Sequence, residues 1–312
     1  MQNKPLISIL IVAYNPWEYL RKTLESCLEQ TYENTEILIL DNASSEDICG
    51  LMVWWLDGLI ESQKWDEYMI TIPKTKNQKL KTIKLIKSTT NLGPYNGLNL
   101  LLEQAKWDYI AIQDHDDIWH REKLEKQINF LETHHEYIGC GTNTIMYYEA
   151  DQRYFEYFLD EENYYTIHPS LVFRSTTLPS YHPTILPFRY DTSETEYMCD
   201  AYSLKYNLCN GEKKIYNLSE PLTLHLIKST SANYSYRWHR LTRANIQRVY
   251  DLHSFSYATL TIIWEIMRKI IYPILNILGL WKWINPIERI PFRIMGKKIE
   301  KMEGNEWWRE YL

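Results

Sequence analysis

The sequence has few cysteines and no glycine-rich, phosphate-binding loop near its start. Each of these features argues against a class of protein. The five cysteines are scattered, and no two form a C-x-x-C pair (Cys27, Cys49, Cys140, Cys199 and Cys209). This spacing argues against a disulfide framework and a zinc site, and it favours a reduced, cytoplasmic protein. The stretch AYNPWEYLRK follows the first apolar run and lacks the glycine-rich, basic character that nucleotidyltransferases use to hold a nucleoside triphosphate.

The sequence also shows neither the features of a signal peptide nor an uninterrupted apolar segment long enough to span a membrane. The start, MQNKPLISILIVAYN, has one lysine and a short apolar run, without the long apolar middle and small-residue cleavage site of a signal peptide. It predicts a strand. The very apolar segment 255–283 is interrupted by Glu265, Arg268 and Lys269, whereas a transmembrane helix needs about 20 clean apolar residues.

Charge is unevenly distributed along the chain. The net charge is −6, with −12 on residues 1–236, +8 on residues 237–301 and −2 on residues 302–312. An acidic body argues against a general nucleic-acid binder, whose basic face is expected on the main domain. We favour one or two amphipathic helices within 255–283 as a peripheral membrane contact, with three tryptophans at the headgroups (Trp264, Trp281 and Trp283). The alternative is a helical pair packed on the body, as in a homo-oligomer contact.

The first half of the chain alternates buried strands with amphipathic helices. This pattern predicts an α/β fold with a mostly parallel central sheet and helices on both faces. Ligands of such sheets bind at the carboxyl ends of the strands, where Asn15, Asp41 and Asp114 fall. The expected strands are 6–14, 36–41, 83–88 and 109–114, and the expected helices are 17–30, 94–106 and 121–134.

Two regions depart from this alternation. Residues 54–82 hold three tryptophans and a series of lysines that includes Lys74, Lys76, Lys79 and Lys81, which favours a solvated hairpin or insertion over a phosphate-steering surface. Residues 140–236 are irregular and rich in tyrosine and proline, which is compatible with an acceptor pocket.

Three aspartates and a histidine follow the strand expected at 109–114. The stretch AIQDHDDIW contains Asp114, His115, Asp116 and Asp117. Crowded carboxylates repel one another unless a positive charge compensates them, and hard oxygen ligands suit Mg²⁺ or Mn²⁺. The alternative is the acidic first turn of the following helix, a role that Asp117 could partly fill. We favour the metal site.

Two other motifs stand at or near strand ends. Asp41, in LILDNASSED, can accept hydrogen bonds from a nucleobase N–H or a ribose hydroxyl, or it can be an ordinary turn residue. The turn NLGPYNGLN opens a helix and can bring backbone and amide groups close to a ligand through Asn91, Gly93, Asn96 and Asn99.

The four motifs ISILIVAYN, ILDNASSED, NLGPYNGLN and IQDHDDIW, in this order, resemble the family 2 glycosyltransferases of the GT-A fold. The resemblance covers roughly residues 5–230. It implies a Rossmann-like GT-A domain over 1–236, with a donor half at about 1–135 and an acceptor half at 136–236. Residues 237–312 would then be a basic, aromatic helical extension. The D-x-D-D-x-W form resembles bacterial rhamnosyltransferase-like members and suggests cell-surface polysaccharide assembly.

The resemblance also implies the roles of single residues. The nucleotide base would be held by the first strand end and the second-strand aspartate, and the metal by Asp114 and Asp116. Mn²⁺ or Mg²⁺ would bridge the diphosphate of a UDP- or dTDP-sugar. His225 and Lys228 fall where the family often has a basic residue near the diphosphate. The expected donor contacts are Ala13, Tyr14, Asn15, Asp41, Asn91, Gly93, Asn99, Asp114 and His115.

The family's catalytic base usually lies in a later Glu-Asp motif, and here that motif is altered. The matching stretch is TSETEYMCDAYSL, in which Ser193 and Glu194 replace the pair. Glu194 is therefore the leading candidate for the base, and the alternatives are Asp191, Glu196 and Asp200. An ordinary acidic helix start would also explain these residues.

The function implied by the resemblance is metal-dependent, inverting transfer of a sugar to a hydroxyl of a cell-surface glycan or lipid-linked precursor. The site would face the cytoplasm at the inner side of the cell membrane, without nucleic acid as a partner. A non-catalytic nucleotide-sugar-binding or scaffold protein is the alternative, favoured by the altered Glu-Asp motif and opposed by the intact D-x-D. Trp119 is expected either beside the sugar or in the core.

Overall fold

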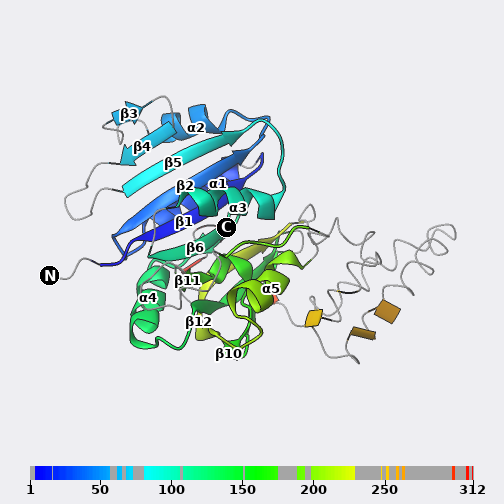
Figure 1. Ribbon diagram of the computed structural model, residues 1–312. Helices are drawn as coiled ribbons and strands as arrows, with labels where there is room; N and C mark the ends of the chain where they lie inside the picture. The colour runs from blue at the N-terminus through cyan, green and yellow to red at the C-terminus, as the bar shows by residue number, and fades with distance from the viewer. Residues whose placement is uncertain are drawn as a thin grey trace.

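The computed structural model gives a mixed α/β architecture built on a long sheet (Figure 1). It describes most of the first 228 residues and short pieces of the remainder. The described residues are 4–15, 17–56, 62–64, 68–72, 81–105, 108–149, 152–174, 188–193, 198–228, 247, 251–252, 258–259, 262–263, 297–298, 307–308 and 311.

The centre of the sheet is four parallel strands in the order β6-β1-β2-β5. They are β1 (Ile7–Ala13), β2 (Thr35–Asn42), β5 (Lys81–Ser88) and β6 (Tyr109–Asp114). All four predicted strands are confirmed. Parallel strands in this position are covered on both faces, which is why β1 is an almost continuous run of buried residues.

Helices cover the two faces of this sheet (Figure 1). On one face, α1 (Trp17–Leu28), α2 (Ile48–Trp55) and α4 (Lys123–Thr133) pack against the strands. On the other face lie α3 (Pro94–Gln104), the short α5 (Cys199–Ser203) and the π-helix η3 (Leu204–Leu208). The three predicted helices are confirmed, and α2 is an addition that the sequence reading did not identify.

Beyond β6 the sheet becomes mixed. Strand β11 (Val172–Arg174) runs antiparallel to both β6 and β8 (Gly139–Tyr148), and β12 (Ile215–Ile227) runs parallel to β8. The prediction of a mostly parallel sheet therefore holds for the four central strands β6-β1-β2-β5. The remaining elements here are β7 (Ile118–Trp119), β9 (Arg153–Tyr157), β10 (Glu162–Asn163), β13 (Lys297–Lys298) and the 3₁₀ turn η2 (His168–Ser170).

The interruption at 54–82 contains a hairpin, as predicted. Strands β3 (Ser62–Lys64) and β4 (Tyr68–Ile72) pair antiparallel, and β4 adds to the edge of the sheet beside β5. Figure 1 shows this hairpin at the end of the sheet opposite β12.

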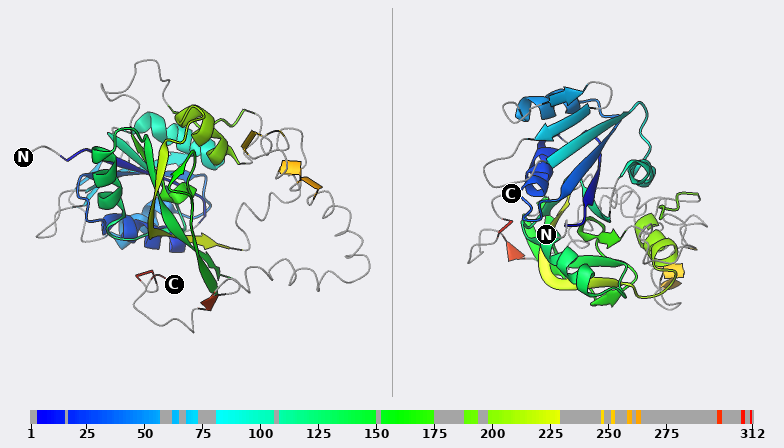
Figure 2. Two further views of the ribbon diagram at one scale, coloured as in Figure 1. Left: turned by 90° about the horizontal axis from the view of Figure 1, so that it is seen from below. Right: turned by 60° about the vertical axis from the view of Figure 1, so that its left-hand side comes forward.

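Residues near the C-terminus pack against the β12 end of the sheet (Figure 2). Trp308 is fully buried, 4.7 Å from the ring of Tyr154. The Trp307 Nε1 donates to the carbonyl of Pro221 at 3.3 Å, and the Tyr311 carbonyl accepts from Lys22 at 2.7 Å. These residues form a small core with Leu224 and Leu226 of β12.

Most of the segment predicted at a membrane surface, 255–283, lies outside the described residues. In the described part of the chain, no helix combines the length and the apolar character that crossing a bilayer requires.

Trp308 should therefore contribute strongly to stability. We expect Trp308→Ala to lower the free energy of unfolding by about 3 kcal/mol, because it leaves a cavity under β12. Urea unfolding followed by circular dichroism measures this. Trp54, which is 72% exposed, provides the control, since Trp54→Ala should change stability by less than about 0.5 kcal/mol. Equal effects of the two substitutions would contradict the assignment of Trp308 to the core.

Candidate active site

The three aspartates at the end of β6 and just beyond it have three different partners. The Asp114 Oδ1 lies 3.7 Å from the His168 Nδ1. The Asp116 Oδ2 forms an ion pair with the Lys228 Nζ at 2.7 Å. The Asp117 Oδ2 lies 2.7 Å from the His225 Nδ1. Each carboxylate therefore meets a basic side chain, and two of these basic residues follow one another closely on or just after β12.

Asp117 is fully buried and connects the end of β6 to β12. Its Oδ1 accepts a hydrogen bond from the backbone N–H of Leu226 at 2.8 Å, while its Oδ2 faces His225. Its carbonyl accepts from the Gln113 Nε2 at 2.7 Å and the Thr23 Oγ1 at 3.0 Å. Helix α4 begins at Lys123, so the alternative of a helix-capping Asp117 is wrong.

Charges in this cluster displace one another's pKa values. Burial raises the pKa of Asp117 to about 7, against the opposing effect of His225. For His225, burial opposes the charged form, but the charge and hydrogen bond of Asp117 raise the pKa to about 9. Burial also raises the pKa of Asp114, but the hydrogen bond and charge of His168 outweigh it and leave that pKa below its usual value.

Asp114, Asp117 and His225 form the metal-compatible group of the described residues. Their candidate ligand atoms lie within 4.8 Å of one another. Both oxygens of Asp117 already have protein partners, and one of them, Oδ2, faces the His225 Nδ1. The predicted ligand Asp114 belongs to this group, whereas the predicted ligand Asp116 is held in an ion pair by Lys228.

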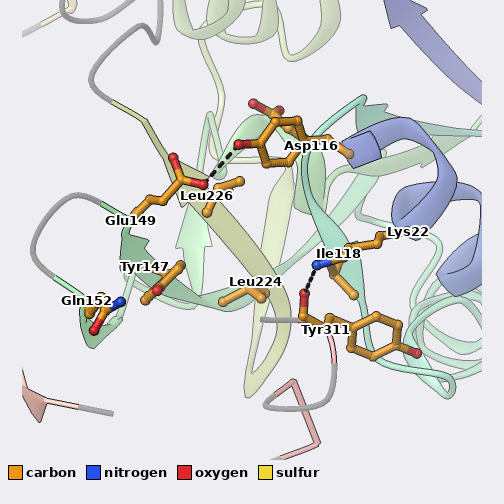
Figure 3. A pocket seen from close by; sticks show the side chains of 10 residues that line it. Lys22, Asp116, Ile118, Tyr147, Glu149, Gln152, Leu224, Leu226 and Tyr311 are labelled. Atoms are coloured by element: carbon orange, nitrogen blue, oxygen red, sulfur yellow. Dashed lines mark hydrogen bonds between the residues drawn. The ribbon is translucent and has the colours of Figure 1, made fainter. Parts of the chain in front are cut away.

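A pocket of about 220 Å³ opens beside Asp116 (Figure 3). Tyr19 crosses one side, where its hydroxyl donates to Glu149 at 2.9 Å and its ring lies 3.9 Å from the Lys228 Nζ. The lining combines apolar residues of β12 with polar groups from α1 and β8. It consists of Tyr19, Lys22, Asp116, Ile118, Tyr147, Glu149, Gln152, Leu224, Leu226 and Tyr311.

The predicted base-binding residues meet at the neighbouring ends of β1 and β2. Ala13 is buried and pairs in register with Asp41, which is 2% exposed. The Asp41 Oδ1 accepts from the Ser44 N–H at 2.9 Å. Tyr14 is 48% exposed and leaves its ring accessible, while Asn15 adopts a left-handed conformation with φ of 50°.

The NLGPYNGLN turn is fixed by a residue that sequence reasoning did not select. Asn42, at the end of β2, accepts from the Leu92 N–H at 2.8 Å and donates to the Asn91 Oδ1 at 3.0 Å. Gly93 has φ of 77° immediately before α3, a conformation that favours glycine. Asn42 follows Asp41 directly, and its position at a strand end was the available signal.

Asn99 has a structural role in this arrangement. Its Nδ2 donates to the carbonyl of Tyr190 at 2.9 Å, and its Oδ1 accepts the Tyr190 N–H at 2.8 Å. The amide of Asn99 therefore holds the 188–193 segment, which precedes the predicted base motif. His168, also missed from the sequence, lies between this segment and Asp114, with its Nε2 2.8 Å from the Tyr190 hydroxyl.

Of the four candidates for the catalytic base, the structure describes Asp191 and Asp200. The Asp191 Oδ1 accepts from the backbone N–H of Ser193 at 3.0 Å and from its hydroxyl at 2.6 Å. Glu194 and Glu196 lie outside the described residues. Asp200 lies in the first turn of α5.

Two further candidates from the D-x-D-D-x-W motif have clear positions. Trp119 is 1% exposed, and its Nε1 donates to the carbonyl of Pro169 at 2.7 Å. Trp119 thus belongs to the core, and the alternative of a sugar contact is wrong. His115 is partly exposed between the two carboxylates of the D-x-D.

Comparison with known proteins agrees with this arrangement. The family model described as glycosyl transferase family 2 matches residues 8–51 and 71–192, more than half of the chain. The chain belongs to glycosyltransferase family 2. The matched part of this family 2 chain contains β1, β2, β5 and β6 with the whole D-x-D-D-x-W motif.

Two curated relatives match over 153 and 128 residues. The chain is 34% identical to the putative glycosyltransferase EpsE of Bacillus subtilis, over 49% of this chain and 48% of that protein. It is 37% identical to the WfaP glucosyltransferase of Escherichia coli, over 41% of this chain and 42% of that protein. The chain thus spans about half the length of the curated relatives it matches.

Solved structures share the GT-A fold with this family 2 chain. Residues 1–349 of TarS from S. aureus superpose with a TM-score of 0.51 at 15% identity, covering 81% of this chain and 68% of that one. The mannosyltransferase PcManGT of Pyrobaculum calidifontis, in complex with GDP-Man and Mn²⁺, superposes with a TM-score of 0.50 at 13% identity, covering 80% and 62%. At this identity the likeness concerns the fold.

The Asp117–His225 pair should make stability fall as the pH rises. Folding raises the pKa of His225 from 6.5 to about 9, so the stability it contributes is complete below pH 6.5 and is lost as the pH rises through 9. We expect the difference in unfolding free energy between wild type and His225→Gln to shrink between pH 6.5 and 9.5. Urea titrations in EDTA measure it.

The matched control for this measurement is His135→Gln, which changes an exposed histidine just after α4. Because this side chain is exposed, its substitution should change stability by less than about 0.5 kcal/mol over the same range. A pH-independent difference for His225→Gln would contradict the proposed pairing with Asp117.

Proposed function

We propose that this protein is a metal-dependent, inverting glycosyltransferase that moves a sugar from a nucleoside-diphosphate donor to a hydroxyl of a glycan or lipid-linked acceptor. The observation that carries the proposal is the cluster of Asp114, Asp116, Asp117 and His225 at the end of β6, in a family 2 chain. Ligands of α/β sheets bind at this edge.

The metal site rests on the donor set. Asp114 and the His225 Nε2 would hold Mn²⁺ or Mg²⁺, with Asp117 orienting the imidazole and Asp116 joining when Lys228 moves away. Carboxylates suit both ions, and the imidazole favours Mn²⁺ among them. A bound divalent ion would neutralise charge that develops on the leaving diphosphate. Lys228, 2.7 Å from Asp116, would supply a further positive charge to the same group.

The nucleotide would occupy the ends of β1 and β2. The exposed ring of Tyr14 offers a stacking surface, and the carboxylate of Asp41 can accept from a base N–H. Ala13, Asn15, Asn91 and Gly93 would shape this subsite, with His115 near the diphosphate. The fold neighbour TarS has been solved with UDP-GlcNAc, and a UDP- or dTDP-sugar is our proposal for this chain.

The acceptor would be activated by the altered acidic motif. A carboxylate, for which Glu194 is the leading candidate, would take the proton of the acceptor hydroxyl. The acceptor oxygen would bond to the anomeric carbon as the bond between that carbon and the diphosphate breaks. A single displacement of this kind inverts the anomeric configuration. Asp191 and Glu196 are the alternatives, and one oxygen of Asp191 already accepts two hydrogen bonds from Ser193.

The proposed setting is cell-surface glycan assembly at the cytoplasmic face of the membrane. WfaP is named as acting on GlcNAc-diphosphoundecaprenol, and TuaG of Bacillus subtilis as a putative teichuronic acid biosynthesis glycosyltransferase. Residues 1–236 would form the transferase and 237–312 the extension, with 255–283 at the bilayer surface or in a homo-oligomer contact. A catalytically inactive nucleotide-sugar-binding role is the second candidate, because Ser193 interrupts the Glu-Asp pair.

Metal dependence is tested by turnover of a panel of UDP-, dTDP- and GDP-sugars. We expect release of nucleoside diphosphate from one donor, abolished by EDTA and restored by Mn²⁺. Asp114→Asn and Asp116→Asn should each lower kcat by about 100-fold or more, in the range of lost electrostatic stabilisation. Asp160→Asn, at an exposed site, is the control and should keep full activity. Turnover that survives EDTA would remove the metal from the proposal.

The base assignment is tested with acceptor-dependent transfer once the donor is known. Glu194→Gln should lower the transfer rate by about 100-fold or more while donor affinity stays within about twofold, because general-base catalysis contributes about 10²–10⁴ in rate. Asp191→Asn should lower it less. Full transfer by Glu194→Gln would exclude Glu194. Tight donor binding with no transfer by the wild type would favour the non-catalytic role.

A further inference from the structure

His168 lies between the carboxylate of Asp114 and Tyr190, which belongs to the 188–193 segment before the predicted base motif. On one side its Nδ1 lies 3.7 Å from the Asp114 Oδ1, and on the other its Nε2 lies 2.8 Å from the Tyr190 hydroxyl. Its side chain is 11% exposed. The Tyr190 hydroxyl, the His168 ring and the Asp114 carboxylate form a chain of two contacts, a 2.8 Å hydrogen bond and a 3.7 Å approach of the ring to the carboxylate.

Tyr190 and the segment that carries His168 are both held by hydrogen bonds to neighbouring elements. Tyr190 is 3% exposed, and its backbone N–H and carbonyl both pair with the amide of Asn99 on α3. The rings of Tyr95 and His168 lie 5.4 Å and 5.5 Å from the ring of Tyr190. The 3₁₀ turn that begins at His168 is bound to β6 through the Leu171 carbonyl, which accepts from the Ile112 N–H at 3.0 Å.

We infer that His168 is a positioning residue, which sets the placement of Asp114 relative to the 188–193 segment through the Tyr190 hydroxyl. This inference rests on the proposed function, because it assigns Asp114 to the donor and metal site. Transfer needs the metal-binding carboxylate and the base at a fixed separation, and small displacements of a reacting group lower the rate strongly. A bridge with one partner on each side meets this need.

Tyr190→Phe isolates the bridge. It removes the hydroxyl that faces His168 and keeps the aromatic ring and the backbone pairing with Asn99. His168→Asn can still reach toward Asp114 from the Nδ1 position, but it is too short to reach Tyr190. The control is Tyr32→Phe, which removes a hydroxyl from another buried tyrosine, one that donates to the carbonyl of Pro5 at 2.7 Å.

The measurement is a double-mutant cycle read by Mn²⁺ affinity and by kcat and KM for the donor that the wild type turns over. We expect Tyr190→Phe and His168→Asn each to weaken Mn²⁺ binding and to lower kcat by about fivefold to tenfold, with donor KM changed by less than about twofold. The double variant should be no worse than the weaker single variant, because both break one chain. Tyr32→Phe should match the wild type in all three constants.

The outcomes separate this inference from the proposed function. Additive losses, or a Tyr190→Phe variant with wild-type constants, would overturn the bridge and leave the transferase proposal intact. A loss that is confined to the thermal midpoint, with Mn²⁺ affinity and kcat unchanged, would make the chain merely structural and would also overturn it. A wild type that neither binds Mn²⁺ nor turns over any donor would overturn the proposed function, and the bridge with it.

Discussion

The site depends on one buried carboxylate, that of Asp117. A charge without solvent is tolerated when hydrogen bonds and an opposite charge compensate it, and here the Leu226 N–H and the His225 ring do so. The same residue's carbonyl accepts from Gln113 and Thr23. Through these contacts one residue joins the end of β6, α1 and β12. The orientation of His225, and so the geometry of the proposed metal site, follows from that junction.

The two carboxylates of the D-x-D, those of Asp114 and Asp116, lie in different environments. Asp114 meets His168 on the side of the sheet covered by α3, and Asp116 meets Lys228 beside Tyr19 of α1. A basic side chain close to each carboxylate reduces the repulsion between these crowded aspartates. In the proposed function, Lys228 and a divalent metal would both neutralise charge on the diphosphate.

Residues near the C-terminus contact the elements that surround this site. Trp308 packs under the strand that carries His225, and the carbonyl of Tyr311 binds Lys22 on the wall of the pocket beside Asp116. The last described residues of the predicted extension 237–312 thus pack against β12 and α1. The match covers about half the length of EpsE and WfaP. Trp308 and Tyr311 lie beyond the segment that the family model matches.

The sequence by itself determined the parallel core and the candidates at its edge. Period and burial along β1, β2, β5 and β6 are local properties, and strand ends are where polar residues such as Asp41 and Asp114 become visible. The tertiary structure decided which partner each carboxylate has. Asp117 and His225 are 108 positions apart, and their contact depends on the register of β12 against β7 and β8. Long-range register also buried Trp119, assigned Asn99 to the Tyr190 backbone and brought His168 to Asp114, because no local pattern encodes pairing between distant strands.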